Sequence, residues 1–478
     1  MGLRPHLVAA ISLVLMVVGL YWPTVDYDFV NWDDPWYVVN NDMIKSWHPA
    51  NLWDVATKVA IRNYAPVTLF SYLVEHSLWG LWPGGYHTTN FLFHALNAVL
   101  VYFFIGRLTG SRFVGWTTAA LFAVHPLQLE SVAWISSRKG LISATFLLMS
   151  LQYWFRPDRT ARDEAFGLLF YAISLLAKAL GIVLPAMVLV YDIFVRKMKF
   201  GEAFSRQIIP GMLAVWLLLV TMGAQTTEVG GVREHLEWSK ARIVAVDSVI
   251  LWQYVSMLAA PSDLCVLYDP QTEGIGIAVA LSMCAWGLVL AFVWRRRTSN
   301  PLLLVALFSF FALLFPVLNF FPITTLMNDR YLYLPSVALF ATAAAFVEWL
   351  FVKVRPSSNE EMDRSVRWRQ VPWGQVCAYS LAAAVVAQNA VAAHRHLPVW
   401  RNSTSLWENA FEQNPQIPVV RIQWAYALHD AGREAEAIAM LEETLVKTKP
   451  DEADRKRILR KLDEWGRDHA SNPGGARL

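Results

Sequence analysis

Eleven apolar stretches recur along the 478-residue chain, and they constrain its fold more than any other feature. A helix that crosses a bilayer needs about 20 mostly apolar residues, because lipid offers its backbone no hydrogen-bonding partner. The stretches occupy residues 6–22, 87–106, 113–125, 140–155, 165–179, 181–195, 207–224, 274–294, 301–320, 331–352 and 374–393. The sequence therefore predicts an all-α polytopic membrane protein with a bundle of about 11 transmembrane helices.

The composition excludes the main soluble classes. Apolar residues make up 55% of the chain and charged residues 17%, whereas soluble domains contain about 25% charged residues. The formal net charge is only +3, far from the strong positive charge typical of proteins that bind nucleic acid, so no nucleic-acid partner is expected. Single scattered cysteines and the lack of Walker A, zinc-protease and hydrolase motifs give no support to nucleotide, zinc or triad chemistry.

Basic residues predict the orientation, because positive charge accumulates in the cytoplasmic loops of membrane proteins. Alternate segments carry that charge: Arg4 and the loops at 107–112, 156–162, 196–206, 295–297 and 353–369. We therefore expect the amino terminus in the cytoplasm and the carboxyl-terminal tail outside it.

The number of membrane crossings depends on whether the segment 241–262 crosses. It is apolar, but it carries Asp247 and ends at Ala260-Pro261. We interpret it as a re-entrant or interfacial helix that does not cross. If it crosses, the tail changes sides, unless another predicted span is also wrong.

Three parts are expected along the chain. Residues 1–393 form the membrane domain, 394–468 a small helical domain, and 469–478 a flexible tail. The first outer loop, 23–86, belongs to the membrane domain and is rich in tryptophan, which is typical of a loop at the lipid headgroup level. Its tryptophans are Trp32, Trp36, Trp47, Trp53, Trp79 and Trp82.

The helical domain has the spacing of a helix–turn–helix unit. Small Ala427 and Ala437 allow close packing, Gly432 permits the turn, and Pro450 ends the second helix. The pattern resembles one tetratricopeptide repeat, with a half-repeat before it and a capping helix at 455–468. Stable arrays need about three units, so this domain is expected to lean on the bundle. A plain helical tail is the alternative.

Two adjacent carboxylates, Asp33 and Asp34, lie in the first outer loop. Adjacent carboxylates repel, so at least one should have a raised pKa or bind a cation. A carboxylate just above the membrane can act as general base or as ligand of a divalent metal ion, which is the only cofactor the sequence suggests. A solvated turn fixed by Pro35 is the alternative.

Further polar residues gather at the predicted outer face. Cations there suit a lipid-linked phosphate, although snorkelling to headgroups or local pairing are alternatives. If 127–135 is helical, Glu130 and Trp134 share one face. The candidates are Glu130, Arg138, Lys139, Lys178, Asp329 and Arg330.

A polar stripe of His87, Asn90, His94 and Asn97 runs along one face of the second predicted span. Such a stripe faces protein or a water-filled cavity rather than lipid. Hydrogen bonding between helices is the favoured interpretation, and His87 is kept as a substrate-binding candidate.

Several motifs, in this order, extend along nearly the whole chain. They are FVNWDDPWYV at 29–38, NYAPVT at 63–68, LWGLWPGGYH at 78–87, FLFHALN at 91–97, HP at 125–126, ESVAW at 130–134, SRK at 137–139, NDRYLYLP at 328–335 and WRNS at 400–403. Together they resemble bacterial tetratricopeptide-repeat membrane proteins related to the eukaryotic transmembrane-and-tetratricopeptide O-mannosyltransferases, which belong to the GT-C class of polytopic glycosyltransferases.

This resemblance implies a GT-C-like bundle in the bacterial inner membrane. It implies inverting transfer of a sugar from a polyprenyl-phosphate donor to an extracytoplasmic protein hydroxyl or glycolipid. Catalysis is then expected at Asp33 or Asp34, with Glu130 as a supporting carboxylate. Arg138, Lys139 and Arg330 become candidates for the donor phosphate.

The sequence also departs from the family pattern at Ala65, Gly140 and Ala179, where polar or otherwise different residues are usual. These departures keep a second hypothesis open: a non-catalytic scaffold that binds periplasmic or secretion partners through its tail. A transporter or flippase is a third, although the half-symmetrical repeats of secondary transporters are not evident.

Overall fold

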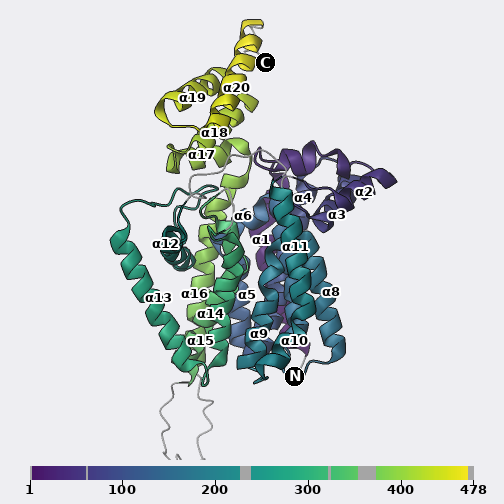
Figure 1. Ribbon diagram of the computed structural model, residues 1–478, viewed down its shortest axis with the longest axis vertical. Coiled ribbons are helices and arrows are strands. Elements are labelled where there is room, and N and C mark those ends of the chain that lie inside the picture. The colour runs from purple at the N-terminus through teal and green to yellow at the C-terminus, as the bar shows by residue number, and fades with distance from the viewer. Residues whose placement is uncertain (1–2, 61–62, 227–237, 321–324, 354–372, 472–478) are drawn as a thin grey trace, which may run out of the picture.

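The computed structural model describes residues 3–60, 63–226, 238–320, 325–353 and 373–471. Within these ranges the chain is helical and contains no β-strand, apart from one isolated bridge between Ala60 and Asn63. A bundle of long helices carries a small helical tail at one end, and the amino terminus lies at the other end (Figure 1).

The predicted apolar stretches form helices whose ends differ from the predictions by only a few residues. The bundle contains α1 (Leu3–Tyr21), α4 (Pro83–Thr109), α5 (Arg112–Val124), α7 (Arg138–Trp154), α8 (Ala161–Ala177), α9 (Leu184–Phe194), α10 (Phe200–Arg206), α11 (Ile208–Thr226), α12 (Lys240–Ala259), α13 (Gly276–Arg296), α14 (Pro301–Leu314), α15 (Pro335–Glu348) and α16 (Trp373–His396). The predicted span at 301–320 is shorter than expected, because a 3-10 turn containing Pro316 follows α14.

Five described helical segments are long and apolar enough to cross a membrane, and the bent pair α10 and α11 would make a sixth. The five segments are Arg4–Asp26, Pro83–Thr109, Lys240–Ala259, Gly276–Arg296 and Trp373–Trp400. Shorter apolar helices pack beside them. The chain is therefore a multi-pass membrane protein, whereas the total of about 11 crossings stays a prediction.

Helix α12 differs from its neighbours in direction. Its length and hydropathy would allow it to cross. Figure 1 views it nearly end-on, with its axis across those of α13 and α14, in the half of the bundle nearest the tail. Its Asp247 is buried and accepts a hydrogen bond from the amide of Asn319. The expectation that this segment does not cross stays a prediction, and the direction of α12 agrees with it.

The polar stripe of α4 is buried in the bundle and bonds neighbouring helices, as predicted. Asn90 donates to the carbonyls of Val132 and Trp134 at 3.1 and 3.0 Å. His94 and Asn97 both contact the hydroxyl of Tyr333, at 2.8 and 3.0 Å. The hydrogen-bonding interpretation is therefore confirmed for these three residues.

The first outer loop also has regular structure. It contains the short helices α2 (Pro49–Thr57) and α3 (Pro66–Trp79), and α6 (Leu129–Ala133) lies beyond α5. The tryptophans divide into two sets. Trp36, Trp47, Trp53 and Trp82 are exposed, as expected at a headgroup surface, whereas Trp32 and Trp79 pack inward.

The tail consists of α17 (Ser403–Gln413), α18 (Pro418–Asp430), α19 (Glu434–Lys447) and α20 (Glu452–Ser471). Gly432 adopts φ +77°, a left-handed conformation that permits the turn between α18 and α19. The helix–turn–helix prediction is confirmed, and its assignment as a tetratricopeptide repeat stays a prediction. The predicted boundary at 393 falls inside α16, α20 reaches Ser471, and residues 472–478 lie outside the described part.

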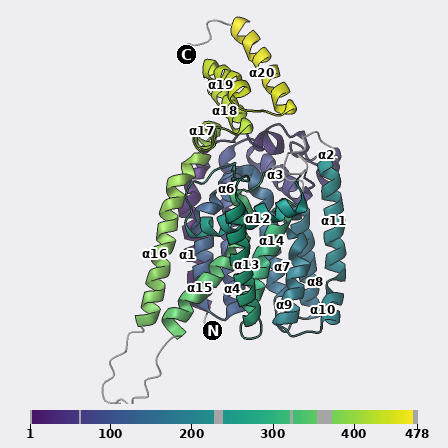
Figure 2. The same cartoon turned by 60° about the vertical axis from the view of Figure 1, so that its left-hand side comes forward.

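The tail leans on the bundle, as its small size predicted. Gln413 and Asn414, at the end of α17, donate to the carbonyls of Leu264 and Leu267 at 3.0 Å each. Those carbonyls belong to the segment that follows α12. The start of α17 contacts the first outer loop, and Figure 2 shows it directly above the bundle, beyond the end of α16.

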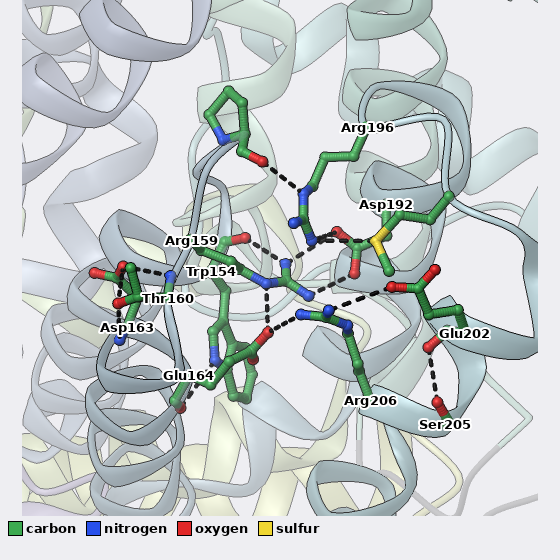
Figure 3. A network of polar contacts seen from close by, with 12 residues as sticks. Trp154, Arg159, Thr160, Asp163, Glu164, Asp192, Arg196, Glu202, Ser205 and Arg206 are labelled. Carbon is green, nitrogen blue, oxygen red and sulfur yellow. Dashed lines mark hydrogen bonds and ion pairs between the residues drawn. The ribbon is translucent and has the colours of Figure 1, made fainter.

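A buried ion-pair network holds the opposite end of the bundle together (Figure 3). Arg159 donates twice to Asp192, at 3.0 and 2.6 Å, and both side chains are fully buried. Arg196 reaches the same carboxylate at 3.1 Å, and Arg159 also reaches Glu164 at 2.6 Å. The network joins the segment between α7 and α8 to α9 and to the start of α8.

Candidate functional site

The loop that carries Asp33 and Asp34 turns at residues 31–33 and continues into a short π-helical turn, Pro35–Val39. Proline suits the first position of such a turn, because its missing N–H would be unpaired there anyway. The two carboxylates differ in burial. The side chain of Asp33 is 25% exposed, whereas Asp34 is 1% exposed.

Asp34 anchors this loop to the bundle. Its carboxylate accepts the backbone N–H groups of Val30 and Ser136, both at 3.0 Å, and the hydroxyl of Ser136. Burial raises the pKa of Asp34 to about 6, and these hydrogen bonds oppose the shift. The expectation that one carboxylate has a raised pKa is confirmed, but the main cause is burial, and repulsion by Asp33 contributes least.

The raised pKa of Asp34 predicts a pH-dependent stability. Between pH 4 and 6 the carboxyl group of Asp34 is protonated to a greater extent in the folded protein than in the unfolded chain. Its contribution to the free energy of unfolding is therefore complete below about pH 4 and is lost as the pH rises through 6. From pH 4.5 to 7 the loss should reach about 2 kcal/mol. We expect the melting temperature of the wild type, relative to that of Asp34→Asn, to fall over this range.

The control for that measurement is Asp54→Asn, which changes a carboxylate of α2 in the same loop that pairs with Lys58 near the surface. The same carboxyl-to-amide change at this surface position serves as the reference. A difference in melting temperature between Asp34→Asn and the wild type that does not vary with pH would contradict the raised pKa of Asp34.

Asp33 faces a cation. Its carboxylate lies 3.5 Å from the Nζ of Lys139, in the first turn of α7. The same ammonium lies 3.3 Å from the hydroxyl of Tyr37 and 4.3 Å from the centre of its ring. Asp33 is therefore a partly exposed carboxylate that pairs with a mostly buried lysine.

Glu130 and Arg330 form the second ion pair of the site, although they lie 200 residues apart in the chain. The Glu130 carboxylate also accepts the backbone N–H of Arg330 at 2.8 Å. The guanidinium lies 5.4 Å from the ring of Trp134. Burial lowers the pKa of Arg330, but Glu130, with help from Asp33, raises it above its usual value. Arg330 therefore stays charged.

The segment 127–135 is helical only as far as Ala133, and Arg330 pairs with Glu130 rather than with its neighbour Asp329. Helix α6 ends at Ala133, and Trp134 is extended with ψ 117°. Asp329 instead accepts a hydrogen bond from Tyr268 at 2.6 Å. Burial and the nearby Glu130 raise the pKa of Asp329, so this carboxyl group favours its neutral form beside the Glu130–Arg330 pair.

Lys178 completes the group of cations. It follows α8, with φ −164° and ψ 141°, where the chain leaves that helix. Burial, together with the nearby Lys139 and Arg330, lowers the pKa of its side chain to about 7, and the nearby Glu130 opposes this shift. No ion pair of Lys178 is found among the described residues. The structure thus brings Asp33, Lys139, Lys178, Glu130 and Arg330 together.

Two further candidates lie elsewhere. Arg138 is fully buried and bonds Asn90 at 2.8 Å and the carbonyl of Tyr86 at 2.6 Å, and it pairs with Glu75. These partners occupy its donors, so Arg138 joins α7 to α3 and α4. His87 is buried beneath the loop, edge-on to Tyr27 at 6.2 Å. Neither lies in the group around Asp33.

The site gives a shared divalent cation no support. Asp33 and Asp34 have separate partners, and both oxygens of Asp34 accept hydrogen bonds. Across the described ranges, no group of three or more acidic, histidine or cysteine side chains is arranged to hold a metal ion. A cation at Asp33 and Asp34 stays a prediction.

The sequence did not single out four residues that shape the site. Tyr37 contacts Lys139, Ser136 holds Asp34, Tyr268 bonds Asp329 and Glu75 pairs with Arg138. Tyr37 lies inside the FVNWDDPWYV motif, and Ser136 directly precedes SRK, so their positions carried a signal. Tyr268 and Glu75 lie in no motif, and only the folded chain reveals them.

No family model matches the chain. Curated relatives do match it. It is 29% identical over 189 residues to a mouse protein O-mannosyl-transferase, TMTC1, covering 35% of this chain and 20% of that protein. It is 24% identical over 377 residues to human protein O-mannosyl-transferase TMTC3, and the match covers 68% of this chain and 41% of that protein. The Caenorhabditis elegans protein O-mannosyl-transferase F38B6.6 is 24% identical over 373 residues, and the match covers 73% of this chain and 52% of that protein.

The similarity therefore spans between a fifth and about half of these relatives' own length. It agrees with the resemblance seen in the motifs. Two solved structures also match. The Archaeoglobus fulgidus oligosaccharyltransferase tethered with an acceptor peptide has a TM-score of 0.46, 12% identity and coverage of 93% of this chain and 59% of that chain. ArnT from Cupriavidus metallidurans bound to undecaprenyl phosphate has a TM-score of 0.41 and 15% identity, and the match covers 89% of this chain and 72% of that chain.

Proposed function

We propose that this chain is a membrane glycosyltransferase that moves a sugar from a polyprenyl-phosphate donor to an acceptor hydroxyl outside the cytoplasm. The observation that carries the proposal is the partly exposed Asp33 beside Lys139, with Lys178 and the Arg330–Glu130 pair close by. A carboxylate within a group of cations suits a reaction that removes a proton and releases a phosphate. Similarity to protein O-mannosyl-transferases supports the same class.

The proposed reaction is a single displacement. The carboxylate of Asp33 accepts the proton of the acceptor hydroxyl as its oxygen bonds to the anomeric carbon of the sugar. The bond from that carbon to the phosphate oxygen breaks, and the lipid phosphate leaves with both electrons. Attack opposite the leaving group inverts the anomeric configuration. No metal ion is required for these steps to balance.

The cations have distinct roles in this proposal. Lys139 holds the carboxylate of Asp33 in place through their ion pair until the acceptor arrives. Arg330 is held in place by Glu130 and lines the path of the leaving phosphate. Lys178 forms no ion pair among the described residues, and a bound phosphate would favour the charged form of its side chain, so it is the basic group most available to the phosphate.

The proposal places the site outside the cytoplasm. The donor is a polyprenyl-phosphate sugar in the bacterial inner membrane, and the acceptor is an extracytoplasmic protein or glycolipid. The amino terminus is then cytoplasmic and the tail periplasmic, which fits the opposite positions of these ends in Figure 1.

A second candidate function is a scaffold that binds partners through the tail. The departures at Ala65 and Gly140 favour it, because they remove charge or polarity near the proposed site, and Ala179 is a third departure from the family pattern. Gly140 is not sterically required, since a Cβ there would meet no atom within 4 Å. The scaffold hypothesis predicts that removing the chain after about residue 400 abolishes function, whereas replacing Asp33 has no effect.

A mass comparison of extracytoplasmic proteins and glycolipids tests the proposed function. It uses wild-type cells, a deletion strain, and deletion strains complemented with the wild type or with Asp33→Asn. Loss of a sugar-sized mass in both the deletion and the Asp33→Asn strain supports the transferase. Full rescue by Asp33→Asn, with no mass change anywhere, supports the scaffold.

Removing the charge of Lys178 should weaken phosphate binding. We expect Lys178→Met to raise the Kd for undecaprenyl phosphate about 10-fold, equivalent to about 1.4 kcal/mol. Binding is measured by native mass spectrometry of the full chain in nanodiscs. The control Lys58→Met removes an exposed lysine of α2 that pairs with Asp54. Equal affinities of the two variants would exclude Lys178 from the phosphate site.

A further inference from the structure

The start of α17 holds the segment that leads to Asp33. The backbone N–H of Asp28 donates to the carbonyl of Arg401 at 2.9 Å. The backbone N–H of Asn31 donates to the hydroxyl of Ser403 at 2.9 Å. The indole N–H of Trp407 donates to the side-chain carbonyl of Asn31 at 2.5 Å. Three hydrogen bonds therefore tie residues 28–31 to the tail.

An aromatic contact reinforces these bonds. The rings of Trp32 and Trp407 meet edge to face, with centroids 5.2 Å apart and an interplanar angle of 72°. Trp407 is fully buried, so its indole N–H has no solvent alternative to Asn31. Edge-to-face pairs contribute about 0.5–1.5 kcal/mol beyond their burial. The contact fixes the residue directly before Asp33.

Asp33 lies between two anchors. The tail holds residues 28–32 on one side, and on the other side Asp34 is held by Ser136. Within the described residues, the side chain of Asp33 has one polar contact, to Lys139 at 3.5 Å. Its position is therefore set by its backbone, and the backbone is set by these anchors.

We propose that Ser403 and Trp407 are positioning residues for Asp33, so that the tail is a working part of the transferase site. This inference rests on the proposed function. A general base must lie within hydrogen-bond reach of the proton it removes, and a displacement of about 1 Å can reduce a rate about 100-fold. Releasing the tail anchor lets the segment before Asp33 move while the cations stay in the bundle.

The test compares Trp407→Phe with Trp465→Phe. Phenylalanine at 407 keeps an aromatic ring against Trp32 but removes the N–H that Asn31 accepts. Trp465 is a buried tryptophan of α20 that packs on His429 at 4.2 Å, so its replacement is the same chemical change elsewhere in the tail. Ser403→Ala is a second variant, which leaves the N–H of Asn31 unpaired.

Three quantities are measured at matched expression of the full chain. We expect Trp407→Phe and Ser403→Ala to slow product formation at least 10-fold, with the Kd for undecaprenyl phosphate unchanged within 2-fold. Hydrogen exchange at the amides of residues 28–33 should rise in both variants. Trp465→Phe should leave all three quantities at the wild-type level.

The outcomes separate the two proposals. If Asp33→Asn retains transfer, the proposed function fails whatever the tail variants do. If Asp33→Asn is inactive while both tail variants react at the wild-type rate, only the positioning role is overturned. The positioning role is also overturned if Trp465→Phe loses as much activity as Trp407→Phe, or if the tail variants lose phosphate affinity, because both results indicate general structural damage.

Discussion

Asp33→Asn is expected to reduce sugar transfer at least 1,000-fold while the protein stays folded. General base catalysis typically contributes about 100- to 10,000-fold, and asparagine cannot accept the proton. The substitution should be structurally mild, because Asp33 is partly exposed and its carboxylate has one polar contact among the described residues, to Lys139 at 3.5 Å. The rate of appearance of the modified acceptor is the measurement.

Asp54→Asn is the matched control, since it makes the same change in the same outer loop, and it should leave transfer intact. Undecaprenyl phosphate should bind Asp33→Asn as tightly as the wild type, which separates the chemical step from donor binding. Transfer at the wild-type rate by Asp33→Asn would remove Asp33 from the mechanism.

Asp192→Leu is expected to destabilise the protein by about 3–5 kcal/mol, because it removes the fully buried carboxylate that pairs with both Arg159 and Arg196, and leaves the buried Arg159 paired with Glu164 alone. Arg159 makes two hydrogen bonds to this carboxylate, and Arg196 makes a third (Figure 3). The measurement is the apparent melting temperature in detergent, together with the fraction of protein that remains monodisperse.

Glu202→Gln is the control for the buried pair. Its carboxylate pairs with Arg206 at 3.3 Å and is 57% exposed, so its replacement should cost about 0–1 kcal/mol. The double variant Arg159→Met/Asp192→Leu should recover part of the loss, because it removes both buried charges. Equal melting temperatures of Asp192→Leu and Glu202→Gln would show that the buried network does not stabilise the fold.

The membrane architecture could be predicted from the sequence because the bilayer acts on each span separately. Span α4, for example, needs only its own apolar length and its polar stripe to be identified. The direction of α12 is different. Its composition allows a crossing, and only packing against neighbours such as Asn319 determines how it lies.

The sequence predicted most residues of the candidate site, but it predicted few of the ion pairs between them. Asp33, Glu130 and Arg330 each lie in a motif, but the pairing of Glu130 with Arg330 joins positions 200 residues apart. Arg138 was expected at a phosphate because of its place beside Lys139. Successive helical residues point about 100° apart, so Lys139 faces Asp33 while Arg138 turns inward to Glu75.

The bond between Asn31 and Trp407 also has a consequence for biosynthesis. These residues are 376 positions apart, and at about 5–20 residues per second a ribosome needs roughly 20–75 s to proceed from one to the other. For most of that interval the first outer loop exists without its tail partner. A nascent chain would therefore contain Lys139, Lys178 and Arg330 before the segment next to Asp33 is anchored, and under the proposed function sugar transfer would begin only once α17 has emerged.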